Sequence, residues 1–138
     1  MGTIKNFEDL GCLQNARVLA NQVYDILDTL PNNKFGLINQ IERAAISIMN
    51  NISEGFGRFS NKDFVRFLDY SHGSSNEVKN LTYLLEDRKY ISSEKGIELR
   101  ILIAKIKSEI LALIKHLVKS FNPKIVSEPN EPYNPKTY

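Results

Sequence analysis

Apolar residues recur every three or four positions along four stretches of this 138-residue chain, and this period constrains its fold more than any other feature. The first stretch runs from about residue 8 to about residue 30, before Pro31, and the second ends near residues 54–57. The third starts after Ser60 and ends before Tyr90, and the fourth follows Ser92 or Ser93, either of which can cap it. No β-like alternation of useful length competes, and the connections are short. The pattern predicts an all-α, antiparallel up-and-down four-helix bundle.

The fourth stretch carries two neighbouring apolar stripes. Its main stripe consists of Leu99, Ile103, Ile106, Ile110, Leu113 and Leu117. Beside it lies a second stripe of Leu111, Ile114, Val118 and Phe121. One stripe is enough to join a bundle, so the second predicts either a wide buried face or a contact with another subunit. The sequence favours neither alternative.

The chain divides into one domain and a tail. Residues 1–121 form the predicted bundle domain, which is long enough to bury about two-thirds of its unfolded surface in one core. Residues 122–138 hold four of the five prolines and few apolar side chains. We expect this proline-rich tail to be flexible or bound to a partner, and its composition favours flexibility.

Residues 51–58 join two predicted helices and contain two glycines, a carboxylate and an arginine. Glu54 and Arg58 have the spacing and order of a helical ion pair. Gly55 and Gly57 suit a helix end or the close approach of another backbone. Just beyond, residues 60–63 fit a helix-capping pattern. We therefore predict a structural corner made of Asn51, Glu54, Gly55, Gly57 and Arg58, and a binding role for Arg58 stays open.

Small side chains interrupt the inner stripe of the third helix, at Ser71, Gly73, Ser74 and Ser75. Their size predicts a close approach of a neighbouring helix, with Gly73 and Ser74 as the close-packing positions. His72 lies among them, but a lone histidine is more often a packing or surface residue than a ligand.

Motifs of catalysis are missing from the sequence. It contains no phosphate-binding glycine loop, no H-E-x-x-H and no G-x-S-x-G, and neither His72 nor His116 follows a glutamate at the spacing used in di-iron bundles. We expect a protein that is not an enzyme and that holds no metal or cofactor.

Cys12 is the only cysteine, so an intrachain disulfide is excluded and a reducing compartment is expected. No secretion signal is visible, and charges break every apolar run before the ~20 residues that a membrane span needs. These features predict a cytoplasmic protein without membrane attachment.

Basic side chains with interleaved aromatics are the best functional lead. Residues 34–66 carry a net charge of +2 and residues 97–121 of +3, although the whole chain has only +2. Lysines opposite an apolar stripe are usually a solvated face; the alternative is a surface that binds nucleic acid through phosphates, without base specificity. The aromatics are Phe59, Phe64 and Phe67. The candidate nucleic-acid-binding residues are Arg58, Lys62, Arg66, Arg100, Lys105, Lys107, Lys115 and Lys119.

The segment from residue 7 to about residue 121 resembles a known family. The most specific part is Asn-Ile-x-Glu-Gly-x-Gly-Arg at residues 51–58. Other matching positions include Phe7, Gln14, Gly36, Arg43, Ser47, Ser60, Phe64, Phe67, Gly73, Glu77 and Tyr90. Together they resemble the bacterial four-helix bundle proteins, which include those encoded in intervening sequences of 23S ribosomal RNA genes.

The resemblance implies an up-and-down bundle that assembles into a ring-shaped homopentamer without established catalytic residues. A remoter similarity in fold connects it to accessory proteins of diversity-generating retroelements, which are basic pentamers that bind nucleic acid and a reverse transcriptase. The chain departs from the family pattern at Leu13, Glu42 and Met49, and Lys79 stands in a stretch that is usually acidic. A basic surface would therefore be displaced relative to that of its relatives.

From these observations we predict a non-enzymatic, oligomeric helical scaffold that binds RNA or DNA, with a reverse transcriptase or another nucleic-acid enzyme as a possible protein partner. The alternative is a protein-protein assembly or regulatory factor that binds no nucleic acid. In that case the lysines only keep the surface soluble.

Overall fold

Four long helices make up the described part of the chain, as the sequence predicts. The computed structural model describes residues 4–121, and the proline-rich tail at residues 122–138 lies outside them. The helices are α1 (Gly11–Leu27), α2 (Phe35–Phe56), α3 (Asn61–Asp87) and α4 (Ser93–Phe121). A short 3-10 turn, η1 (Phe7–Asp9), precedes α1. The described part contains no strand, and the fold is an all-α four-helix bundle.

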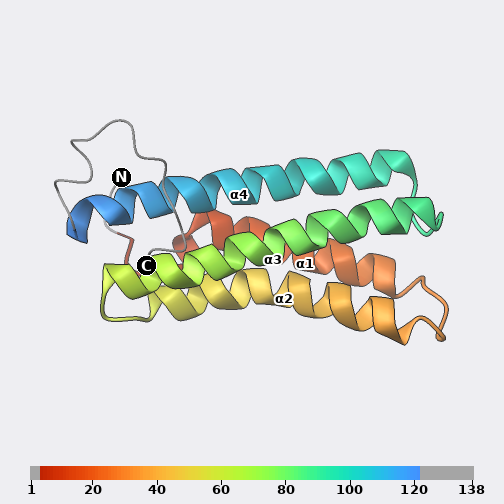
Figure 1. The fold of residues 1–138 in the computed structure, drawn as a ribbon, viewed down its shortest axis with the longest axis horizontal. Coiled ribbons are helices and arrows are strands. Elements are labelled where there is room, and N and C mark those ends of the chain that lie inside the picture. The colour runs from red at the N-terminus through yellow and green to blue at the C-terminus, as the bar shows by residue number, and fades with distance from the viewer. Residues whose placement is uncertain (1–3, 122–138) are drawn as a thin grey trace.

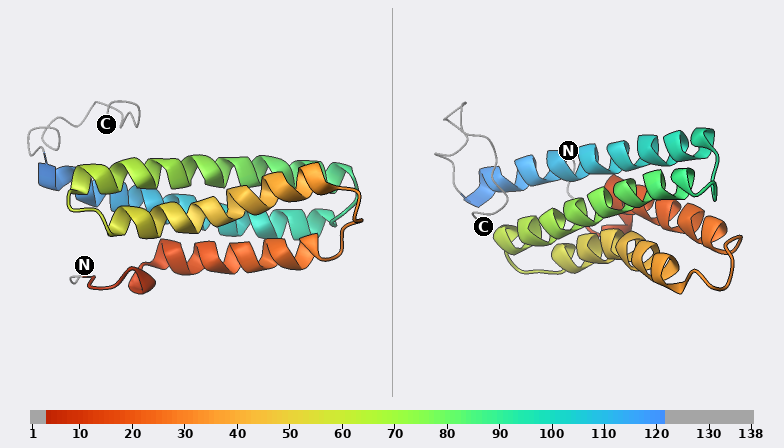
Figure 2. Two further views of the ribbon diagram at one scale, coloured as in Figure 1. Left: turned by 90° about the horizontal axis from the view of Figure 1, so that it is seen from below. Right: turned by 45° about the vertical axis from the view of Figure 1, so that its right-hand side comes forward.

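The helices run up and down along one long axis (Figure 1). Each packs against its neighbours in the sequence, and α1 also contacts α4, which closes the ring of four. Figure 2 shows the same arrangement from two other sides, with the α1–α2 and α3–α4 connections at one end. The α2–α3 corner lies at the opposite end, together with the last turns of α4.

The core confirms the main apolar stripe of α4, because Leu99, Ile103, Ile106 and Ile110 are completely buried. Ile114 and Val118 of the second stripe are buried as well, which supports the wide buried face at these two positions. Leu111 differs, since it is 42% exposed on the outside of the bundle.

The first helix is shorter than predicted. It begins at Gly11 instead of about residue 8, because Leu10 adopts an extended conformation and separates η1 from α1. Its other end also falls earlier, at Leu27, and Leu30 is buried within the following loop. The apolar period correctly predicted that Leu30 is buried, but not that it lies in a helix. A side chain can reach the core from a loop as well as from a helix.

Serine caps start the third and fourth helices. Ser60 precedes α3, and its Oγ accepts a hydrogen bond of 3.1 Å from the Asp63 backbone N–H, which confirms the capping pattern. Of the two serines considered for α4, Ser92 is the cap, since its Oγ accepts a 3.1 Å bond from the Lys95 backbone N–H.

Small polar side chains join α2 to α3, where close packing was predicted. Ser71 is completely buried, and its hydroxyl donates a 2.7 Å hydrogen bond to the Ile48 carbonyl oxygen. The Ser74 hydroxyl lies 2.9 Å from that of Ser47, which also accepts from the Asn51 amide at 2.9 Å. These contacts bring two helix backbones together without leaving buried polar groups unpaired.

Gly73 was wrongly assigned to this close contact. It is exposed, and a Cβ built there would meet no atom within 4 Å. Two residues along a helix correspond to a rotation of about 200°, so Gly73 faces away from the neighbour that buries Ser71.

Gly55 is the glycine that the corner requires. It is buried near the end of α2, and a Cβ there would lie 2.8 Å from both Phe64 Cδ2 and Phe67 Cβ. The structure does not require glycine at residue 57. A Cβ there would stay at ordinary contact distance from its neighbours, and the backbone φ of −77° is accessible to any residue. Close approach therefore explains only one of the two corner glycines.

Among residues 4–121, no helix is both long enough and apolar enough to span a membrane.

Candidate nucleic-acid interface

The α2–α3 corner presents basic and aromatic side chains on one end of the bundle. Gly57 ends α2 and Ser60 caps α3, so only a short turn separates the helices. Because the next residues lie on the first turns of α3, their side chains project beside this turn. We call the resulting surface the corner patch, and it consists of Arg58, Phe59, Lys62, Arg66, Phe67 and Tyr70.

Phe67 holds the centre of the corner patch. The guanidinium carbon of Arg58 lies 4.7 Å from the centre of its ring, and that of Arg66 lies 5.3 Å away. The Tyr70 ring meets Phe67 edge to face, with ring centres 5.8 Å apart. Both arginines thus rest on an aromatic face that limits their motion, while their charged groups stay in contact with water.

Two carboxylates partly balance this charge. Arg58 Nη2 lies 2.8 Å from Glu54 Oε1, as the sequence predicts for the corner, and Arg66 Nη2 lies 3.2 Å from Asp63 Oδ1. All four side chains are more than 40% exposed. Ion pairs so exposed contribute little to stability, roughly 0–1 kcal/mol each. They fasten the corner only weakly, and each arginine can exchange its carboxylate for another anion.

Phe59 stands out because its side chain is completely exposed. It borders a shallow open hollow at the corner, which is also lined by Ser53, Glu54, Gly57 and Arg58. The nearby Phe56 and Phe64 rings pack edge to face with centres 6.0 Å apart. Phe59 is therefore the one aromatic of this turn whose ring is presented to solvent.

The end of α4 adds charge to the same end of the molecule. The Asn61 side-chain amide donates a 2.6 Å hydrogen bond to Ser120 Oγ, which ties the start of α3 to the last turn of α4. Lys62 follows Asn61, and Lys119 precedes Ser120. Lys115 lies one turn earlier, and all three lysines are exposed. The structure therefore brings Lys62, Lys115 and Lys119 to the end that carries Arg58 and Arg66.

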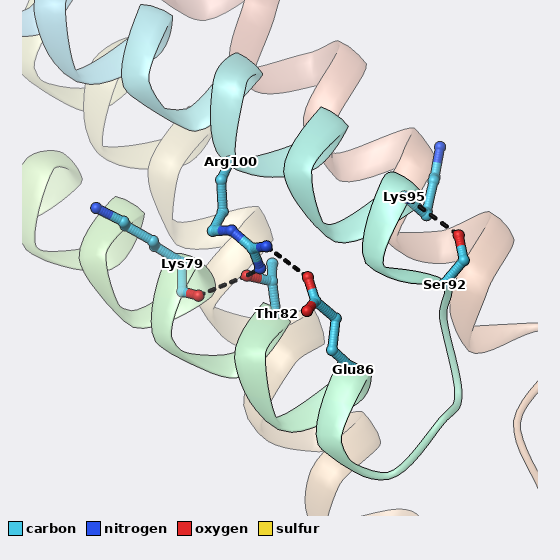
Figure 3. A network of polar contacts seen from close by, with 6 residues as sticks. All are labelled: Lys79, Thr82, Glu86, Ser92, Lys95 and Arg100. Atoms are coloured by element: carbon cyan, nitrogen blue, oxygen red, sulfur yellow. Dashed lines mark hydrogen bonds and ion pairs between the residues drawn. The ribbon is translucent and has the colours of Figure 1, made fainter.

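Arg100 is placed differently from the other candidates. Its guanidinium forms a part-buried ion pair with Glu86 and donates a 3.1 Å hydrogen bond to Thr82 Oγ1 (Figure 3). The guanidinium carbon also lies 4.2 Å from the centre of the Tyr83 ring. Thr82 in turn donates to the Lys79 carbonyl oxygen at 2.6 Å. With only 15% of its side chain exposed, Arg100 joins α3 to α4.

Lys107 and Lys105 lie in the middle of α4, away from the corner. Lys107 Nζ donates a 2.6 Å hydrogen bond to Asn76 Oδ1 of α3. Partial burial, and then the charge of Lys79, lower the pKa of Lys107. Lys105 is exposed on α4. The eight basic candidates therefore divide into five near the corner and three along the helix pair.

Tyr70 is the member of the corner patch that the sequence prediction omitted. It is 51% exposed, although it lies only two residues beyond the buried Leu68. Its spacing of three residues from Phe67 was a usable signal, because residues so spaced share one helix face.

Two titratable side chains outside the corner patch, Cys12 and His72, have shifted pKa values. Burial, and then the charge of Glu109, raise the pKa of Cys12 to about 11, which keeps the thiol protonated. Burial, and then Lys107, lower the pKa of the half-buried His72. Within the part of the chain that the structure describes, no three His, Cys, Asp or Glu side chains gather as a metal site would require.

Comparison with protein families connects this geometry to known sequences. The family model described as 23S rRNA-intervening sequence protein matches residues 8–112, which include α2, α3, the corner between them and most of α4. The chain belongs to this family. The resemblance noted from residues 51–58 is therefore confirmed over most of the bundle.

A solved structure supports the fold of this 23S rRNA-intervening sequence protein. The protein in that solved structure comes from Bacteroides thetaiotaomicron, has unknown function and is assigned to the S23 ribosomal protein family. The two chains share 24% identity with a TM-score of 0.70, over 75% of this chain and 98% of the other. At this identity the likeness concerns the fold alone. The comparison with curated proteins found no match.

Proposed function

We propose that this protein is a non-enzymatic, oligomeric helical scaffold that binds RNA or DNA through the basic end of the bundle. The observation that carries the proposal is the convergence of Arg58, Lys62 and Arg66 of the corner with Lys115 and Lys119 of α4. Two of these five cations, Arg58 and Arg66, are paired with the Glu54 and Asp63 carboxylates, and both ion pairs are exposed. Phosphate oxygens are strong acceptors for such groups, and contacts of this kind position nucleic acid without specifying its sequence.

The test is a titration of a labelled structured RNA at low salt. Neutralising phosphates releases counterions, so the affinity should fall steeply between about 50 and 200 mM salt. The double variant Lys115→Ala/Lys119→Ala should bind more weakly and reduce the salt slope by about one for each phosphate that is no longer neutralised. Absence of binding by the unaltered protein at low salt would refute the proposal.

A matched control removes the same charge from the other end of the bundle. Lys34 precedes α2 and Lys89 lies between α3 and α4, and both connections are at the end opposite the corner. Asparagine suits residue 89, whose φ of 60° lies in the left-handed region. The variant Lys34→Ala/Lys89→Asn should bind RNA like the unaltered protein. An equal loss in both variants would mean that net charge matters and the proposed end does not.

Assembly is proposed from an exposed apolar row on α4. Ile97 is 53% exposed, Ile101 67% and Leu111 42%, and the exposed Ala104 and Ser108 continue the same four-three spacing between them. We propose that this row is the subunit contact, which is the alternative that the sequence left open for the second stripe, at Leu111. Exposed apolar side chains that share one helix face are suited to a contact with another subunit. A ring would repeat the basic end, and several weak patches acting together raise affinity steeply.

The same row supports the second candidate function, a protein-protein assembly factor without nucleic-acid binding. Sedimentation should show an oligomer, a pentamer by the family resemblance, that Ile101→Glu dissociates. Val18 is 47% exposed on α1 and provides the matched control, since Val18→Glu should leave assembly intact. If Ile101→Glu leaves the mass unchanged, the row is not the contact. An oligomer that binds no RNA would favour the second candidate.

The protein partner in this proposal is a nucleic-acid enzyme, with a reverse transcriptase as the class that the remoter resemblance suggests. We place this complex in the cytoplasm. Co-purification of a defined reverse transcriptase with the scaffold after nuclease treatment would support a direct contact, and its loss on nuclease treatment would argue for an RNA bridge.

A further inference from the structure

We propose that Phe59 is a stacking platform for an unpaired base, so that the corner patch recognises single-stranded nucleic acid. This inference rests on the proposed function and narrows its ligand from nucleic acid in general to a single strand. The chemistry recognised is a base next to a phosphate, which RNA and DNA share.

The position of Phe59 suits this role because its ring is free to receive a ligand. Its side chain is completely exposed, whereas Phe56 and Phe64 on either side pack against each other and Phe67 is covered by two guanidinium groups. A fully exposed phenylalanine contributes no buried area to the fold. Stacking on a base would remove its apolar face from water, which is favourable for any of the four bases.

The hollow beside Phe59 is lined by three residues with polar side chains. Phe59 borders it together with Ser53, Glu54, Gly57 and Arg58. Glu54 accepts and Arg58 donates hydrogen bonds, while the Ser53 hydroxyl can do both and already donates to the Asn50 carbonyl oxygen at 3.1 Å. A base resting on Phe59 would therefore find both donors and acceptors beside it.

Three basic residues that could contact the flanking phosphates follow or adjoin Phe59 in the sequence. Arg58 adjoins Phe59 in the turn, Lys62 is exposed on the first turn of α3, and Arg66 follows one turn later. The carboxylates of Glu54 and Asp63 hold the two arginines only through exposed pairs of 2.8 and 3.2 Å. Phosphates can replace these carboxylates at little cost, because exposed ion pairs stabilise weakly.

Single strands are favoured over duplexes for a geometric reason. A base within a duplex is stacked on both faces and must be extruded before it can meet a protruding ring. An unpaired base is already available, so the ring adds affinity for a single strand that it cannot add for a duplex. Backbone contacts alone would favour the duplex, whose phosphates are more densely spaced.

The test compares labelled oligo(U) and oligo(dT) with a duplex of equal length, using the full chain at low salt. Phe59→Ala should weaken binding of the single strands about tenfold, the loss typical of one stacked base, and leave the duplex unaffected. The salt slope should stay unchanged, because no charge is removed. Similar losses for oligo(U) and oligo(dT) are expected, because a base can stack on the ring in both.

Two further variants separate stacking from simple apolar contact. Phe59→Leu keeps an apolar side chain but lacks an aromatic face, so it should bind as weakly as Phe59→Ala. Phe59→Trp should bind at least as well as the unaltered protein. Because the chain contains no tryptophan, its emission would report this position alone and should be quenched when a base stacks on it.

Phe35 provides the matched control. It is 69% exposed at the start of α2, at the opposite end of that helix from the corner, so Phe35→Ala should not change binding. If Phe59→Ala and Phe59→Leu bind single strands normally, the stacking inference is wrong while the proposed function stands. A Phe59→Ala protein of altered oligomeric mass would also overturn it, since Phe59 would then be a subunit contact. If the unaltered protein binds no nucleic acid, both the stacking inference and the proposed nucleic-acid binding are refuted.

Discussion

Replacing Gly55 with alanine should destabilise the bundle, although alanine is the better helix former. Gly55 lies in the last turns of α2, where it is buried against the first turns of α3. A Cβ there would come within 2.8 Å of Phe67 Cβ and Phe64 Cδ2 and within 3.2 Å of the Phe64 carbonyl oxygen. The Phe67 Cβ and the carbonyl oxygen are fixed to the α3 backbone, so a side-chain rotation cannot relieve those contacts.

The magnitude follows from two opposing contributions. Moving a helix to accommodate one extra methyl group in a packed site costs about 3 kcal/mol, at the upper end for overpacking. Alanine returns about 1 kcal/mol of helix propensity relative to glycine. The net loss is about 2 kcal/mol in the free energy of unfolding. For a bundle of this size it corresponds to a fall of about 8 °C in the melting temperature.

Gly73 is the control, because it is an exposed helical glycine whose Cβ would meet nothing within 4 Å. Gly73→Ala should stabilise the protein by up to about 1 kcal/mol. Urea unfolding followed by circular dichroism, supported by thermal melts, measures both variants under the same conditions. If Gly55→Ala is as stable as Gly73→Ala, the two helices do not approach as closely as we describe and the packing argument fails.

Three other predictions follow from the polar and titratable groups. Arg100→Ala should lower the free energy of unfolding by about 1–2 kcal/mol, because it leaves the part-buried Glu86 unpaired, and should leave RNA affinity unchanged. Reduced affinity at unchanged stability would instead make Arg100 a binding residue. Cys12, buried and with a pKa of about 11, should react with a maleimide only when the bundle opens, so labelling of the native protein as fast as of the unfolded chain would contradict its burial. His72 has a lowered native pKa, so the unfolded chain takes up its proton first and stability should fall as the pH drops below about 6.5. His72→Gln should flatten this dependence in urea titrations, and an unchanged slope would assign it to other groups.

The corner shows how far local patterns reach. Its composition alone predicted the end of α2, the Ser60 cap and the Glu54–Arg58 pair, and the structure contains all three. These features depend on residues within four positions of one another, so a single sequence contains the information for them. Local patterns could not tell which of Gly55 and Gly57 is essential. The answer depends on how closely α3 approaches α2, and neighbouring residues do not specify that distance.

The basic candidates illustrate the same division. Residue type and spacing singled out Arg58, Lys62 and Lys119 as well as Arg100, without distinguishing their surroundings. Packing places the part-buried Arg100 between α3 and α4 beside Glu86, and the Asn61–Ser120 contact brings Lys119 to the corner. Gly73 was wrongly placed in the helix contact because small size predicted close packing, whereas direction around the helix decided exposure.

By itself, the sequence determined the helical class, the number of helices, their caps and most of the core, because a period of three to four residues and short-range capping bonds are properties of neighbouring residues. Only the tertiary structure decided which charges are free, which glycine is indispensable and where the exposed Phe59 stands among the basic side chains. Those outcomes arise from contacts between residues tens of positions apart, and the relative placement of two helices creates them.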